Sequence, residues 1–377
     1  MRGPARKNLD GDCASMSSDR AAELQQQAWS LQAEGKLEEA FLAAGEAWRL
    51  MQECDGPVSL DVANLLNDLA EIEAERQRFG AALALAERAR EVQDMLRDRF
   101  PGETAARIRL KTLSMLGSIR RNRGESSDAE AALQQALSLA EREFGPASEE
   151  AAEARNNLGL LYKDQGRFDE GLQLYREALE SIVRLHGEDC PSAATLFHNI
   201  GGILHAQGDF AAAEMPGRKA WEISRRLLGD DDPTAILHAA AWAAILDGLH
   251  RYDESETIYR RALAIFEHAF GPVHYEIAAN LHNLAAVRAE RGDSAQAEEY
   301  YRRALAIKEE LLGEDSPDTA LTRMNLGSLL GATGRRGEAS SLLERAVTVL
   351  DKRLPPGHPH LAIARKRLRE FPGTPEI

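Results

Sequence analysis

The sequence has little cysteine, few aromatic residues and no long apolar run. Only three cysteines occur among 377 residues, and none of them forms a close-spaced pair, which argues against a disulfide framework and a zinc site. No stretch approaches the roughly 18 apolar residues that cross a bilayer as a helix, and residues 1–18 lack the apolar core of a signal peptide. These absences favour a soluble protein of a reducing compartment, and we expect it in the cytoplasm.

Basic charge is also scarce. The chain has 46 lysines and arginines against 61 acidic residues, which gives a formal net charge of −15. This excess of negative charge disfavours nonspecific binding to phosphate backbones and to anionic lipid surfaces. We therefore expect neither nucleic acid nor a membrane among the partners.

Sequence patterns that carry catalytic chemistry are missing as well. There is no phosphate-cradling loop of the Walker or dinucleotide type, no nucleophile elbow and no His-Glu-x-x-His run. Ten histidines invite a metal hypothesis, but His198 and His205 stand seven residues apart, about 10.5 Å along a helix, too far to share one ion. The sequence therefore predicts no enzyme activity, no cofactor and no metal site.

What the sequence does have is a repeat. The strings HRYDESETIYRRAL at His250 and GDSAQAEEYYRRAL at Gly292 align at a spacing of 42 residues. This frame predicts eight turns, at Gly35, Gln77, Gly124, Gly166, Gly208, His250, Gly292 and Gly334. All intervals are 42 residues except the 47 between Gln77 and Gly124, and we place the five extra residues near 99–103.

Two columns of small residues support the alignment. Alanine stands twelve residues after every turn, at Ala47, Ala89, Ala136, Ala178, Ala220, Ala262, Ala304 and Ala346. Alanine or glycine stands seven residues before every turn, at Ala28, Ala70, Gly117, Gly159, Gly201, Ala243, Ala285 and Gly327. Small residues at fixed places let helices approach closely, and apolar residues recur at helical spacing on both sides of each turn. Each repeat is therefore predicted to be a pair of helices.

The repeat resembles the tetratricopeptide family, in the long form found in kinesin light chains and many bacterial proteins. The copy from His274 to Gly313 matches best, with the family's small, aromatic and alanine positions at Ala285, Ala297, Tyr301 and Ala304. The resemblance implies an all-α, right-handed solenoid whose concave surface, lined mainly by first helices, binds segments of other proteins. We expect a disordered tail over 1–18, eight repeats over 19–354, a capping helix over 355–371 and a second tail over 372–377.

The resemblance also implies that residues nine or ten before each turn face the concave surface. Half of these positions hold asparagine or histidine, namely Asn67, Asn156, Asn157, His198, Asn199, His282, Asn283 and Asn325. An asparagine amide can bond both polar groups of a peptide unit, so this ladder predicts a groove for an extended peptide. The alternative is that these amides bond neighbouring helices or loops.

The sixth repeat interrupts the ladder. Its first helix carries Ala240, Ala241 and Ala244 where neighbouring repeats have larger or polar groups. This stretch is either an apolar notch for a ligand side chain or an eroded repeat with no ligand role. Only a fragment of a carboxylate clamp occurs, at Lys111, because the positions around it hold Asp68 and Met115.

The sequence thus favours a noncatalytic scaffold or adaptor that holds an extended protein segment in its groove. A sensor or regulatory subunit, which would control an enzyme or transcription factor by changing superhelix pitch on peptide binding, is the alternative.

Overall fold

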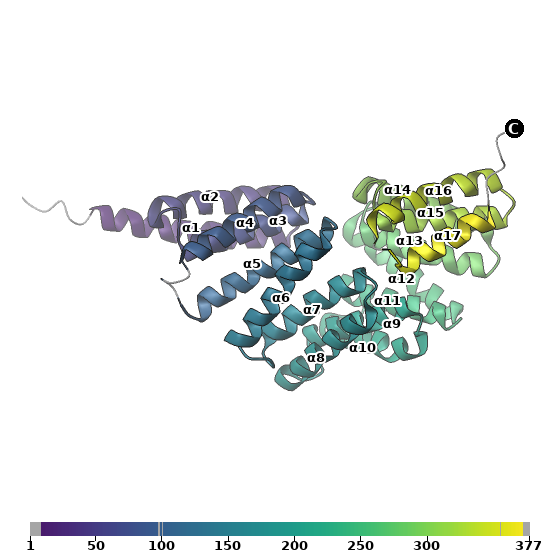
Figure 1. Cartoon of the computed structure of the whole chain (residues 1–377), viewed down its shortest axis with the longest axis horizontal. Coiled ribbons are helices and arrows are strands. Elements are labelled where there is room, and N and C mark those ends of the chain that lie inside the picture. The colour runs from purple at the N-terminus through teal and green to yellow at the C-terminus, as the bar shows by residue number, and fades with distance from the viewer. Residues whose placement is uncertain (1–8, 97–98, 100, 355, 372–377) are drawn as a thin grey trace, which may run out of the picture. The chain divides into compact units, whose positions relative to one another are not determined.

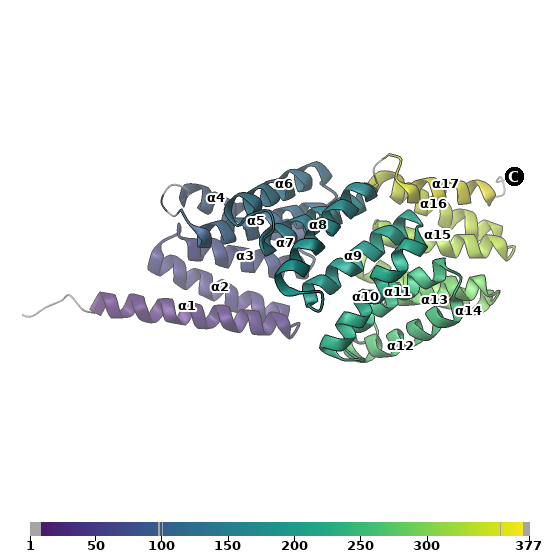
Figure 2. The same cartoon turned by 90° about the horizontal axis from the view of Figure 1, so that it is seen from below.

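The described part of the chain is built from seventeen α-helices with no strand (Figures 1 and 2). This computed structural model describes residues 9–96, 99, 101–354 and 356–371. The helices form two compact units, Met1–Leu161 and Tyr162–Ile377. The predicted all-α class is confirmed. No helix among the described residues is long and apolar enough to cross a membrane.

The first unit consists of three helix pairs and most of a seventh helix. Its helices are α1 (Leu9–Ala33), α2 (Leu37–Asp55), α3 (Leu60–Glu75), α4 (Phe79–Leu96), α5 (Glu103–Asn122), α6 (Ser126–Glu143) and α7 (Glu149–Asp164), of which α7 crosses the boundary between the units. Odd-numbered helices are the first helices of the repeats.

The second unit continues the same alternation. Its helices are α8 (Phe168–His186), α9 (Pro191–Gln207), α10 (Phe210–Leu228), α11 (Pro233–Gly248), α12 (Tyr252–Phe270), α13 (Tyr275–Glu290), α14 (Ser294–Leu312), α15 (Pro317–Ala332), α16 (Arg336–Arg353) and α17 (Pro359–Glu370). The last of them, α17, packs against α16 and α15.

The eight predicted turns all adopt positive φ. Six of them are glycines, for which this conformation carries no steric cost. The other two, Gln77 and His250, have φ of 58° and are the described non-glycine residues with positive φ. The repeat frame is therefore confirmed at every turn.

The alanine column lies inside the helix packing, as predicted. All eight alanines are buried, with at most 1% of their surface exposed. The small column is equally tight: a Cβ atom added to Gly117 would lie 2.4 Å from the Cγ atom of Leu133. Close approach of helices thus explains why these positions hold only alanine or glycine.

The structure shows where the first helix begins and where the five extra residues of the third repeat lie. Helix α1 begins at Leu9, so the predicted disorder over residues 1–18 is wrong for residues 9–18. The sequence of this segment does not indicate a helix because its apolar residues do not recur at helical spacing. The extra five residues fall where expected, since α4 ends at Leu96 and α5 begins at Glu103 and is 20 residues long. The predicted tails over 1–8 and 372–377 lie outside the described residues.

The capping helix also closes the second unit on itself. The His358 ring accepts a hydrogen bond from the backbone N–H of His360 at 3.2 Å, which caps the start of α17. Its other nitrogen hydrogen-bonds the backbone of Asp164, and the ring lies 3.6 Å from where a Cβ atom on Gly166 would be. The start of the capping helix α17 therefore touches the turn between α7 and α8.

Candidate functional site

A groove runs across the first helices of three successive repeats in the first unit. Its volume is 650 Å³. Residues of α3, α5 and α7 line it: Glu71, Ala74, Glu75, Arg107, Leu110, Lys111, Ser114, Met115, Ser118, Ile119, Asn122, Glu150, Glu153 and Asn157. We call this the acidic groove, because four of these residues are glutamates.

Lys111 lies at one wall of the acidic groove and is already paired. Its ammonium group is 2.8 Å from the Asp68 carboxylate and 3.0 Å from that of Glu71. Burial alone would lower the pKa of Lys111, but these two carboxylates raise it above its usual value. Asp68 is buried and also accepts a hydrogen bond from Gln25 of α1, at 2.6 Å. The predicted clamp fragment is therefore a structural ion pair.

The second cation of the groove, Arg107, is paired too. Its guanidinium bonds the carboxylates of Glu103, at 2.7 Å, and of Glu150. Glu153 makes no hydrogen bond or ion pair among the described residues, and the charge of Lys111 acts on it only from a distance. The crowded groove and the carboxylates of Glu149 and Glu150 raise the pKa of Glu153.

The predicted asparagines of the first unit divide between packing and groove. Asn157 is half-buried and lines the acidic groove, and Asn156 beside it is also half-buried. Asn67, in contrast, is fully buried. Its amide oxygen accepts from the Thr112 hydroxyl at 2.9 Å and its N–H reaches the Ile108 carbonyl at 3.4 Å. The prediction that Asn67 faces a ligand is therefore wrong, because these bonds join α3 to α5.

In the second unit the ladder residues of neighbouring first helices bond each other. The amide nitrogen of Asn325 lies 3.0 Å from Nε2 of His282, whose Nδ1 lies 3.0 Å from the Thr322 hydroxyl. Burial lowers the pKa of His282 to about 3, so the ring is neutral. Because Nε2 accepts from Asn325, the ring proton must sit on Nδ1. This fixes the Asn325 amide, whose oxygen and second N–H make no other bond among the described residues.

The other two ladder asparagines of this unit, Asn199 and Asn283, serve the helix packing. Asn199 is buried, with 7% exposed. Asn283 is half-buried and hydrogen-bonds the hydroxyl of Tyr259, which donates to the Asp247 carboxylate at 2.8 Å. Burial raises the pKa of Asp247 to about 6. These two amides support the helix packing.

His198 belongs to a buried imidazole pair. Its ring centroid is 4.8 Å from that of His238, whose Nδ1 lies 2.7 Å from the Ser224 hydroxyl. Burial and the neighbouring His238 lower the pKa of His198 to about 3. Its Nδ1 is buried and has no hydrogen-bond partner among the described residues.

The alanines of the sixth repeat are half-buried on α11. Ala240 packs against two apolar clusters, while Ala241 and Ala244 are partly exposed. Behind them, the preceding repeat has Gly217 where neighbouring repeats have tyrosine, and a Cβ atom there would lie 2.6 Å from Ile245 of α11. This packing favours the interpretation of the fifth and sixth repeats as eroded.

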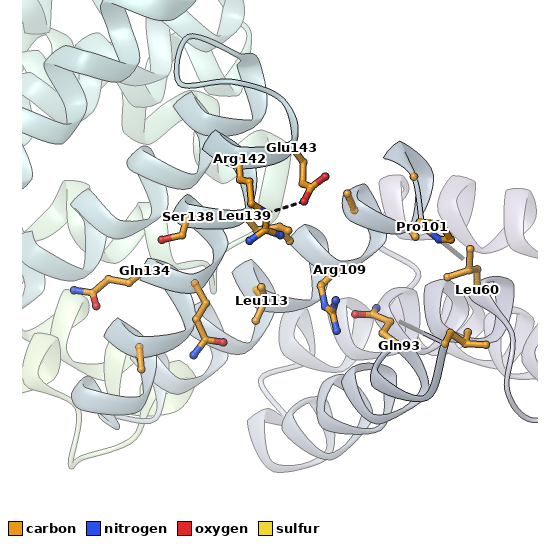
Figure 3. A pocket seen from close by; sticks show the side chains of 16 residues that line it. Leu60, Gln93, Pro101, Arg109, Leu113, Gln134, Ser138, Leu139, Arg142 and Glu143 are labelled. Atoms are coloured by element: carbon orange, nitrogen blue, oxygen red, sulfur yellow. Dashed lines mark hydrogen bonds and ion pairs between the residues drawn. The ribbon is translucent and has the colours of Figure 1, made fainter. Parts of the chain in front are cut away.

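The first unit has a second cavity, which the repeat pattern does not predict. It has a volume of 810 Å³ and opens where the longer connection separates α4 from α5 (Figure 3). Gln93 of α4, Arg109 of α5 and Arg142 of α6 line it, together with leucines such as Leu113 and Leu139. The 47-residue interval was the signal that could have located it. The cavity lies on a different face of α5 from the acidic groove.

Comparison with known proteins agrees with this architecture. The tetratricopeptide repeat model matches residues 109–180, 150–226, 232–310 and 276–352. The chain therefore belongs to the tetratricopeptide repeat family, and it is a protein-interaction scaffold. No curated protein matches it in sequence.

Solved structures show the same fold. A Rap protein complexed with competence and sporulation factor superimposes with a TM-score of 0.57 at 15% identity, over 94% of this chain and 98% of that one. The apo form of RapI gives a TM-score of 0.59 at 15% identity, over 78% of this chain and 98% of that one. BtubC from P. vanneervenii is 23% identical, with a TM-score of 0.45 over 60% of this chain and 89% of that one. At 15% identity the likeness to the two Rap proteins concerns the fold alone.

Proposed function

We propose that this chain is a noncatalytic adaptor that holds an extended segment of another protein in the acidic groove. The observation that carries the proposal is the groove itself, which crosses three successive first helices with Asn157 at its edge. Amide and hydroxyl groups alternate there with apolar side chains, a combination that suits a peptide backbone and its side chains.

The second unit offers a weaker surface of the same kind. Only Asn325 keeps amide groups for a ligand, since Asn199 and Asn283 serve the packing. One hydrogen bond contributes about 0.5–1.5 kcal/mol, too little to hold a peptide by itself. We therefore assign the main ligand contacts to the first unit.

Cys54 and Cys190 form no disulfide, which agrees with a cytoplasmic setting.

The test is affinity capture with groove and control variants of the full chain. Ser118→Trp places a bulky side chain in the acidic groove, and Gln135→Trp places the same side chain at an exposed position of α6 that lines the 810 Å³ cavity on the other face of α5. Groove ligands should be retained by wild type and by Gln135→Trp and lost from Ser118→Trp, provided that all three unfold at similar temperatures. Retention of one set of proteins by all three would contradict the proposal.

A second candidate function is a peptide-responsive sensor or regulatory subunit that controls an enzyme or transcription factor. It is favoured by the contact between His358 and the turn at Gly166, which ties the end of the second unit to its beginning. A change of superhelix pitch would have to break or shift this contact. Small-angle scattering with and without the captured ligand distinguishes the two functions, since an adaptor keeps its shape and a sensor does not.

A further inference from the structure

The acidic groove carries more negative charge than its own cations balance. Its lining includes Glu71, Glu75, Glu150 and Glu153 but only two cations, Lys111 and Arg107. Lys111 is shared between Glu71 and the buried Asp68, and Arg107 between Glu150 and Glu103 just outside the groove. Each cation thus already serves two carboxylates.

Two carboxylates remain without a cation. Glu75 accepts a hydrogen bond from the neutral amide of Gln32 at 2.7 Å, and Glu153 makes no bond within the described residues. The surroundings disfavour the negative charge of Glu153, because partial burial and the carboxylates of Glu149, Glu150 and Glu71 raise its pKa by more than the charge of Lys111 lowers it. A positive group that enters the groove would relieve this repulsion.

The floor between these carboxylates is apolar. Ala74 lies on α3, and Leu110, Met115 and Ile119 lie on α5. A ligand therefore meets carboxylates at the walls and aliphatic or thioether groups below. Lysine and arginine suit such a surface because their stems are apolar and their ends are charged.

We propose that the occupant of the acidic groove is a basic segment of a partner protein, in which lysine or arginine side chains meet Glu71, Glu75 and Glu153 and an apolar side chain packs on the floor. This inference rests on the function proposed above. The helices α3, α5 and α7 are separated by two steps of about 8–10 Å, so about six extended residues at 3.3 Å each span the groove.

The test begins with selection of a displayed library of 12-residue peptides against the full chain. The tightest peptide is then titrated against wild type, Glu75→Gln/Glu153→Gln and Ser118→Trp. The matched control is Glu46→Gln/Glu91→Gln, which removes the same charge from exposed positions on α2 and α4. The changes from glutamate to glutamine keep side-chain size, so folding should survive.

We expect the selected peptides to contain lysine or arginine. The groove double variant should weaken binding roughly 2- to 30-fold, since each solvent-accessible ion pair contributes about 0.2–1 kcal/mol, and the matched control should not. Raising the salt concentration from 0.05 to 0.3 M should weaken binding to wild type more than binding to the groove double variant. If Ser118→Trp fails to fold, Ser118→Lys provides the same test by adding a cation that repels a basic peptide.

The outcomes separate failure of the basic partner from failure of the groove as the binding site. Peptides that Ser118→Trp or Ser118→Lys excludes, but that lack basic residues or tolerate Glu75→Gln/Glu153→Gln, would overturn the basic partner and leave the groove as the binding site. Peptides that bind both Ser118 variants as tightly as wild type would overturn the groove, and with it the basic partner. A selection that yields no binder overturns both.

Discussion

The two units are built from the same repeat but differ in the titratable side chains that their first helices carry. The first unit has no histidine, and the acidic groove crosses its first helices with more carboxylates than cations. All ten histidines belong to the second unit, where two members of the ladder, His198 and His282, stay neutral because burial lowers their pKa. The position in the repeat determines which side of the helix a side chain lies on, and the residues packed around it determine whether a ligand can reach it.

The largest difference should appear as a response to acid. His198 and His282 have pKa values of about 3 when folded, against about 6.5 when unfolded, so protons bind more tightly to the unfolded chain. Stability contributed by the neutral rings is complete above pH 6.5 and is lost as the pH falls toward 3. At pH 5 the loss is about 2 kcal/mol for each histidine.

Hydrogen exchange at pH 7.5 and pH 5, corrected for intrinsic rates, measures this difference helix by helix. We expect α9 and α13 to lose protection at pH 5 while α3 and α5 keep theirs. The variant His198→Gln/His282→Gln should show a smaller response to acid in the second unit. An equal loss in both units of the wild type would contradict the assignment of the acid response to the histidines.

A smaller effect is expected from overpacking the alanine column. Ala262 in α12 and Ala304 in α14 are fully buried, so leucine at either place should lower the free energy of unfolding by about 1–3 kcal/mol. Ala264 lies on α12 as well but is exposed, and Ala264→Leu should change stability by less than about 0.5 kcal/mol. Denaturant midpoints that are unchanged in both buried variants would refute the packing role of the column.

The two kinds of ladder asparagine can be separated within the first unit. Asn67→Ala removes bonds to Thr112 and Ile108 inside the packing and should cost about 1–2 kcal/mol. Asn157→Ala, at the edge of the acidic groove, should leave the melting temperature almost unchanged and should weaken binding of the selected peptide a few-fold. Equal effects of the two changes on stability would remove the distinction between packing and groove.

The sequence predicts the fold well because its signals are local. A turn with positive φ favours glycine, and a close contact between helices needs alanine or glycine. The residue type alone therefore predicts the turn at Gly208 and the buried helix contact at Ala262. The 47-residue interval likewise located the longer connection before α5. The start of α1 at Leu9 was missed because the segment before residue 19 has no apolar period.

The site was harder to predict because exposure depends on the partner helix. Asn67 and Asn157 are the same residue type near the same repeat position, yet Thr112 of the next repeat buries the first amide and no such hydroxyl covers the second. The ion pair of Lys111 with Asp68 joins residues 43 apart, which no single repeat reveals. A sequence pattern therefore predicted a ladder, and three-dimensional packing determined which of its members lie at a groove.

The most direct test of the central claim is photo-cross-linking of the selected basic peptide to the full chain. A photoreactive amino acid replaces Ser118 in the acidic groove in one protein and Gln135 on the exposed face of α6 in the other. Cross-linked product from position 118 and none from position 135 is the predicted result. Cross-linking from position 135 alone would show that the ligand lies on the other face of α5 and α6, and the account of the groove would be wrong.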